Sequence, residues 1–152
     1  PPKQAASVLA WGRFWIEHAG TGGGGFRPLY AEFLDEAAAI VKQPGLRGLA
    51  TRYRALGADW SALATAMLPD SVPALAVIRR TQDKRRAAFE RGDIAAMREA
   101  ETELARGFAA AAAKPPLDDD SLRGHYTDLA ARVTAIADAE EAAATALADA
   151  AD

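Results

Sequence analysis

Apolar residues recur at helical spacing along most of the chain. Between about Gln4 and His18, Trp11 and Trp15 belong to a wide apolar face. From Phe26 to Val41 the apolar positions again step by three and four, with Pro28 in the first turn, where a helix does not need its N–H. Alternating apolar and polar runs of strand length do not occur. The pattern predicts an all-α protein.

The rest of the chain predicts further helices separated by turn and capping residues. Two short helices are expected over 46–56 and 58–68, with Gly57 between them as a break. Three longer helices follow, and their limits are predicted by Pro73, Gly92, Asp93 and Asp118. We therefore expect a helical bundle of about six to seven helices, the last three forming a long antiparallel, coiled-coil-like hairpin set.

The length of 152 residues is that of one domain, so a single helical domain over 1–152 is expected. Because the chain begins at Pro1 rather than Met, we expect a fragment or subunit of a larger protein. The sequence has no cysteine and predicts no disulfide, thiolate metal site or cysteine nucleophile. A net charge of −3 argues against nucleic acid as a partner. No apolar run is long enough for a membrane span, and a cytoplasmic location is expected.

A glycine-rich turn leads directly into the second helix and is the strongest candidate site. Glycines before a helix start let an anion approach backbone N–H groups, and Arg27 inside the helix is placed to clamp it. The alternative is a tight turn between helices, with Arg27 paired to Glu32 or Asp35. No Lys-Ser/Thr pair follows and no strand precedes, which excludes the Walker A and dinucleotide motifs. The candidate ligand or partner contacts are Thr21, Gly22, Gly23, Gly24, Gly25, Phe26, Arg27 and Tyr30.

Basic residues crowd the helix that follows Pro73. One interpretation is a surface that docks an acidic carrier protein, and the other is a solvated face with internal ion pairs. The candidate docking residues are Arg79, Arg80, Lys84 and Arg86. Glu101 and Glu140 fall on the apolar stepping of their own helices. They predict either a polar layer inside the bundle, with Arg85 or Arg132 meeting Glu101, or positions at the solvent rim.

No catalytic or metal-binding constellation is recognisable. His18 follows Glu17 directly, but adjacent helical residues point about 100° apart, and His125 has no Glu-x-x-His spacing near it. Both histidines are expected at the surface or at helix ends. The serines carry no nucleophile-elbow motif. We expect no metal and no cofactor.

The segment from Ile16 to Ala37 resembles the helical C-terminal domain that accompanies the butirosin-biosynthesis acyltransferase family. That family shows an Ile-Glu, a Gly-Thr-Gly-Gly-Gly turn, Phe-Arg, and then Tyr, Phe-Leu and Glu-Ala. The matching positions are Ile16, Glu17, Gly20 to Gly24, Phe26, Arg27, Tyr30, Phe33, Leu34, Glu36 and Ala37. Trp60, with Leu63 and Ala64, is similar to the short helix that follows in the family.

The resemblance implies acyl transfer from a carrier-protein thioester to an amine in natural-product assembly. In that family the chemistry is attributed to a papain-like N-terminal domain with a cysteine nucleophile, and no catalytic residue is carried over to this chain. The expected function is a helical accessory domain that contacts substrate, a carrier protein or the catalytic domain or subunit. The alternatives are a non-catalytic protein-interaction module and an independent small-molecule-binding bundle.

Overall fold

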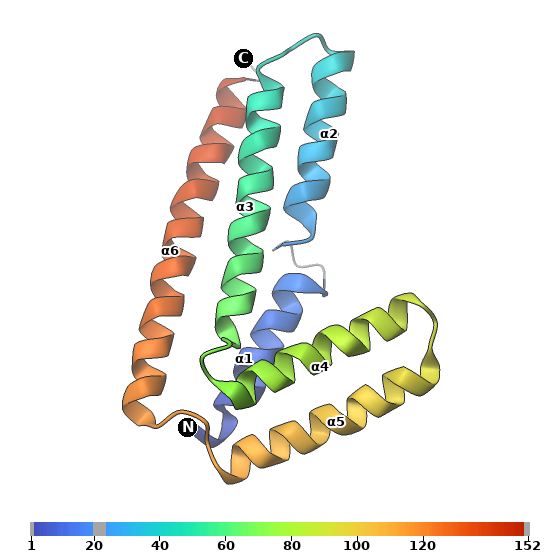
Figure 1. Ribbon diagram of the computed structural model, residues 1–152. Helices are drawn as coiled ribbons and strands as arrows, with labels where there is room; N and C mark the ends of the chain where they lie inside the picture. The colour runs from blue at the N-terminus through green and yellow to red at the C-terminus, as the bar shows by residue number, and fades with distance from the viewer. Residues whose placement is uncertain (1, 20–23, 151–152) are drawn as a thin grey trace. The chain divides into compact units, whose positions relative to one another are not determined.

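The computed structural model describes residues 2–19 and 24–150. Within these ranges it contains six α-helices and no strand, so the predicted all-α fold is confirmed (Figure 1). The helices are α1 (Pro2–Glu17), α2 (Phe26–Ile40), α3 (Leu46–Met67), α4 (Pro73–Glu90), α5 (Ile94–Ala113) and α6 (Asp119–Asp149). In the described part of the chain, no helix has the length and apolar character needed to cross a membrane.

The chain forms two compact units, and each combines segments from distant parts of the sequence. The first consists of Pro1–Arg13 and Thr65–Thr127, and the second of Phe14–Ala64 and Asp128–Asp152. α1, α3 and α6 therefore each contribute residues to both units. The expectation of a single domain over 1–152 stays a prediction.

The first unit is built around an antiparallel hairpin of α4 and α5 (Figure 1). Gly92 ends α4 with a positive φ of 69°, which a residue with a side chain rarely adopts. The carboxylate of Asp93 then accepts a 3.0 Å hydrogen bond from the N–H of Ala96 and caps α5. Both predicted signals are confirmed. The close approach of the two helices is visible at Gly107, where an added Cβ would lie 3.3 Å from Ile78.

A buried arginine ties α1 to α4 inside the first unit. The guanidinium of Arg13 contacts a carboxylate oxygen of Asp83 at 2.5 Å and donates to the Gln82 side chain at 3.0 Å. The Gln82 amide in turn donates to the carbonyl of Ala10 at 3.1 Å. Since a buried charge needs such partners, this cluster fixes how α1 lies on the hairpin.

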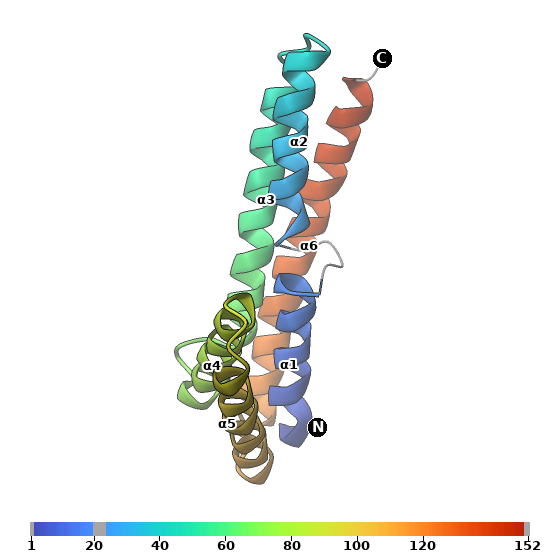
Figure 2. The same cartoon turned by 90° about the vertical axis from the view of Figure 1, so that its right-hand side faces the viewer.

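The second unit is a three-helix arrangement of α2, α3 and α6, which lie side by side in both views (Figures 1 and 2). α2 and α3 run antiparallel and are joined by a short turn in which Lys42 adopts a φ of 58°. Alanines make up half of the buried cluster between α2 and α3, and they let the two backbones approach. The buried cluster consists of Ala31, Leu34, Ala38, Leu46, Leu49 and Ala50.

The predicted break at Gly57 is wrong. α3 is one continuous helix of 22 residues, and Gly57 is buried in its middle. An added Cβ at Gly57 would lie 2.8 Å from Cδ of Pro28 in α2. The glycine therefore serves close packing between two helices, a role that local sequence does not distinguish from a turn.

The apolar faces predicted for α1 and α2 are only partly buried. In α1 the buried residues include Ala6 and Leu9, whereas Trp11 is exposed. In α2 the buried face consists of small residues and Leu34, whereas Phe33 is more than half exposed. Alanines thus form much of the core, because they allow the helix axes to approach closely, and several large apolar side chains point outward.

The last three helices are expected to form one antiparallel set. Of these, α4 and α5 form an antiparallel hairpin. α6 begins in the first unit, but from Asp128 onward it belongs to the second, where it lies beside α3 (Figure 1). Its start is capped as predicted, because the Asp118 carboxylate accepts a 2.8 Å hydrogen bond from the N–H of Ser121. Its buried residues Leu122, Leu129, Ile136 and Ala143 follow an exact seven-residue repeat.

Candidate functional site: an aromatic groove along the second helix

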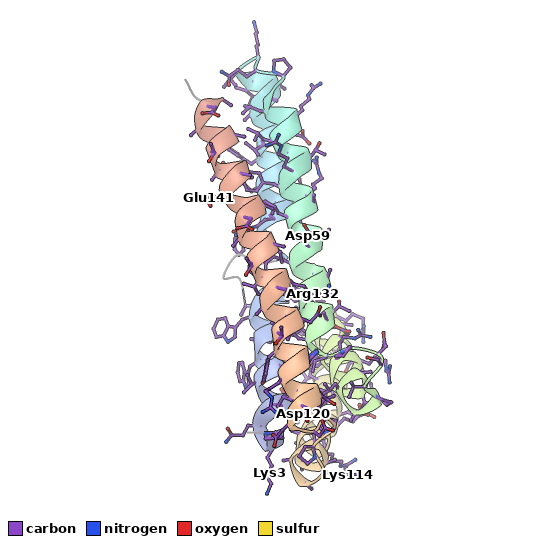
Figure 3. All side chains as sticks on the ribbon, turned by 90° about the vertical axis from the view of Figure 1, so that its left-hand side faces the viewer. Lys3, Asp59, Lys114, Asp120, Arg132 and Glu141 are labelled. Carbon is purple, nitrogen blue, oxygen red and sulfur yellow. The ribbon has the colours of Figure 1, made fainter. Side chains whose placement is uncertain are left out.

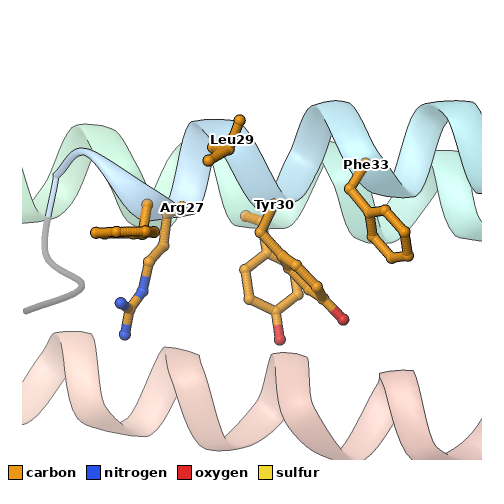
Figure 4. A pocket seen from close by; sticks show the side chains of 6 residues that line it. Arg27, Leu29, Tyr30 and Phe33 are labelled. Carbon is orange, nitrogen blue, oxygen red and sulfur yellow. The ribbon is translucent and has the colours of Figure 1, made fainter. Parts of the chain in front are cut away.

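An open apolar groove of about 360 Å³ runs along α2 in the second unit (Figure 4). Its walls are almost entirely apolar, with one cationic side chain at the end nearest the start of α2. It is lined by Phe26, Arg27, Leu29, Tyr30, Phe33 and Tyr53. Three of the predicted contact residues, Phe26, Arg27 and Tyr30, are therefore brought together here.

Arg27 is engaged by a carboxylate from the other end of the chain. Its Nη2 lies 2.5 Å from Oε1 of Glu140 in α6, and its Nε donates to the same oxygen at 2.8 Å. The indole N–H of Trp60 also donates to this oxygen at 2.8 Å, and the Arg27 guanidinium lies 5.9 Å from the Trp60 ring centroid. Figure 4 shows Arg27 pointing toward α6. The predicted pairing of Arg27 with Glu32 or Asp35 is wrong, and Asp35 pairs with Arg54 instead.

Two tyrosines form the floor of the groove. The rings of Tyr30 and Tyr53 meet edge to face with centroids 4.7 Å apart, and Tyr30 stacks on Phe33 at 5.8 Å. Burial raises the pKa of the Tyr53 phenol, and the neighbouring Tyr30 and Glu140 act in the same direction. Both effects favour the neutral phenol, so Tyr53 provides a hydrogen-bonding group without a charge.

The glycine turn is described only at its end. Thr21, Gly22 and Gly23 lie outside the described residues. The N–H of Gly24 donates to the carbonyl of Ile16 at 3.2 Å, and an added Cβ at Gly24 would lie 2.6 Å from the Ser61 hydroxyl. Gly24 is therefore needed for packing and its N–H is used within the chain, whereas Gly25 is exposed. Anion binding by the earlier part of the turn stays a prediction.

The basic residues of α4 have acidic partners within the first unit. Arg79 and Arg80 face Asp70 at 2.7 and 3.7 Å, Lys84 contacts Glu103 at 3.1 Å, and Arg86 contacts Glu90 at 2.7 Å. This geometry agrees with a solvated face held by internal ion pairs. Carrier docking by these residues stays a prediction.

The two glutamates on apolar steps have different surroundings. Glu101 meets Arg85 at 3.6 Å, as predicted for one alternative, but both side chains are well exposed, as predicted for the other. Glu140 is half-buried and forms the polar cluster with Arg27 and Trp60. Arg132 pairs with Asp128 at 2.9 Å instead of with Glu101.

The described residues offer a second groove and two histidines as further candidate sites. A groove of about 200 Å³ between α3 and α6 is bordered by Asp59 and Arg132 (Figure 3). Among the described residues, no group of three or more His, Cys, Asp or Glu side chains is arranged to hold a metal. His125 lies within 3.3 Å of the carbonyl of Met67, and the His18 ring meets Phe14 edge to face.

Sequence reasoning did not identify five residues of this region as site residues: Leu29, Phe33, Tyr53, Trp60 and Glu140. The first two were assigned to the general apolar face of α2. Glu140 had a usable signal, since a carboxylate on an apolar step suggested a polar layer. Its partner Arg27 is 113 residues away, and nothing local indicates that pairing.

Residues 1–86, more than half of the chain, match the model of a domain of unknown function, DUF4872. No curated protein and no solved structure matches. The matched range contains α1, α2, α3 and most of α4, and with them every residue that lines the groove. The chain therefore belongs to the DUF4872 family.

Proposed function

We propose that this chain is a helical accessory domain of an acyltransferase-like enzyme of natural-product biosynthesis, and that it contacts the catalytic domain through α2. The observation that carries the proposal is that the family resemblance and the groove fall on the same segment of the chain. The segment that resembles the acyltransferase-associated domain, Ile16 to Ala37, is also the one that presents the groove and its exposed apolar side chains.

The surroundings of Arg27 favour the catalytic domain over a phosphate-bearing carrier or substrate. An arginine that binds an external phosphate must have its donors available, and here Nε and Nη2 are directed at Glu140. The remaining features of the groove are apolar walls and a neutral phenol, which suit another protein surface. The chain then acts by holding the catalytic domain, while the cysteine chemistry takes place there.

The test is an acyl-transfer assay with a papain-like domain encoded in the same gene or beside it. We expect transfer from a carrier-protein thioester to an amine to be stimulated by this chain and reduced by Leu29→Asp. The matched control is Ala39→Asp, which adds the same charge at another exposed position of α2. The proposal is overturned if no cysteine-bearing domain is encoded there, or if the chain leaves the rate unchanged.

The second candidate is a non-catalytic interaction module without an acyltransferase partner. The same exposed face of α2 supports it, since such a face is typical of protein contacts. The two candidates differ in one result. A partner that binds α2 but transfers no acyl group supports the module.

A further inference from the structure

α2 carries an exposed apolar stripe opposite its buried face. Phe26, Phe33 and Ile40 follow one another at intervals of seven residues, and Leu29 stands between the first two. Leu29, Phe33 and Ile40 are 58%, 57% and 78% exposed. At about 100° per residue these four positions span about 60° of the helix surface. A stripe of this width and period matches the contact face of a second helix.

The neighbouring surface of α3 turns this stripe into one wall of a groove. Tyr53 of α3 lies beyond Tyr30, so the groove lies between the stripe and the next helix. Figure 4 shows Leu29 and Tyr30 projecting in different directions from α2, with Tyr30 directed toward α6. An amphipathic helix that lies along such a groove places an anchor on each successive turn.

Acidic residues border the stripe on its other side. Glu32 and Glu36 are one turn apart and both exposed, and no ion pair within the described residues involves either of them. The other charges of α2 are already neutralised, since Arg27 pairs with Glu140 and Asp35 with Arg54. The potential beside the stripe is therefore negative, and it favours a partner with positive charges at the matching edge.

We propose that the α2 stripe binds an amphipathic helix of a partner protein whose apolar face is flanked by Lys or Arg. The inference names the chemistry of the partner and rests on the proposed function for the role of α2 as a contact surface. A second copy of α2 is disfavoured as the occupant, because an antiparallel pair brings Glu32 and Glu36 close to the same residues of the other copy. Nucleic acid is disfavoured by the same negative charges.

The test uses two labelled, stapled helical peptides of the same length as α2. Both have leucines at the spacing of the stripe; one has lysines at the flanking positions and the other has glutamates. Fluorescence anisotropy measures their affinity for the full chain. We expect the lysine peptide to bind about ten-fold more tightly at low salt, with the preference declining as salt is raised. The double variant Glu32→Lys/Glu36→Lys should reverse the preference.

Two further variants complete the design. Glu141→Lys adds a positive charge on the side of α6 turned away from α3 and should leave the preference unchanged (Figure 3). Phe33→Asp should abolish binding of both peptides while helicity by circular dichroism stays constant, because residue 33 already meets solvent.

Three results overturn the inference. These are equal affinities for the two peptides, no binding of either by the folded chain, and a dimer in sedimentation that Phe33→Asp dissociates. None of them depends on acyl transfer. If the peptides show no selectivity but the chain still stimulates acyl transfer, only this inference fails. If selectivity is seen but acyl transfer is not stimulated, only the proposed function fails.

Discussion

Replacing Glu140 by alanine is the most informative change for the site, because one oxygen of this side chain accepts from both Arg27 and Trp60. The variant leaves a guanidinium and an indole N–H without their acceptor. Hydrogen bonds to charged groups contribute about 1.5–3 kcal/mol each when well buried. The Arg27 and Glu140 side chains are 24% and 29% exposed, so water replaces part of what is lost. We expect the free energy of unfolding to fall by about 2 kcal/mol, an intermediate value between exposed and fully buried pairs.

A double-mutant cycle separates the pairing from the other effects of truncation. Arg27→Ala, Glu140→Ala and the double variant are compared in urea denaturation followed by circular dichroism at 222 nm. We expect a coupling energy of about 1–2 kcal/mol between the two residues. The matched control is the exposed i, i+4 pair of Asp128 and Arg132 in the same unit, for which about 0.3–0.5 kcal/mol is expected.

A coupling no larger than that of the control pair would refute the reasoning. Arg27 would then be free to bind an external anion, as first predicted from the sequence. An independent measurement is the effect of inorganic phosphate on the melting temperature. We expect no stabilisation of the wild type through Arg27, and a measurable stabilisation of Glu140→Ala, in which the guanidinium has lost its partner.

Three other predictions concern the fold. Gly57→Ala should destabilise the chain by up to about 2 kcal/mol in urea denaturation, because overpacking against the proline ring of α2 outweighs the gain in helix propensity. The control is Gly48→Ala in the same helix, which has open space and should stabilise the chain by about 0.5–1 kcal/mol. Equal effects of the two substitutions would contradict close packing at Gly57. Asp93→Ala should lower the stability by about 1 kcal/mol in thermal unfolding, since α5 loses its cap. The hydrogen bond from Arg79 lowers the pKa of Asp70, so its stabilising contribution is complete above the ordinary value of about 3.9 and declines as the pH falls through the lowered value. An NMR titration of the Asp70 carboxyl should show the pKa rising in Arg79→Ala.

The helices could be predicted because their signals are local. Pro28, Pro73, Asp93 and Asp118 mark helix starts, and each acts within one turn of its own position. Gly92 could be predicted as a helix end for the same reason. These signals do not depend on which helices later pack together.

The faces of the helices could not be predicted with the same success. Periodicity finds the apolar side of a helix, but α2 has apolar residues around more than half of its surface. Leu34 is buried and Phe33 is exposed, and which side of α2 faces α3 depends on the close approach of the two helices, as at Gly57 and Pro28. The contact contains alanines and leucines, and Phe26 and Phe33 stay exposed. Only the tertiary structure carries this information.

The site was predicted in part for a related reason. Phe26, Arg27 and Tyr30 follow from their proximity to the glycine turn and from the family resemblance. The ion-pair partner of Arg27 was predicted wrongly because the acceptor comes from α6, and pairing between distant segments has no local signature. Tyr53 was missed because it lies on α3, and no local signal links it to the residues of α2.

The assembly of the second unit from both ends of the chain has a consequence for synthesis on the ribosome. α2 and α3 are synthesised early, but Glu140 lies 113 residues after Arg27 and is synthesised much later. Until then the groove-forming helices lack the third member of their bundle, and the arginine has no acceptor. The segment 1–86 that matches the family model contains Arg27 and Trp60 but not Glu140, so it lacks the acceptor that α6 supplies. A truncation at residue 86 should yield helices that associate non-specifically rather than a smaller native protein.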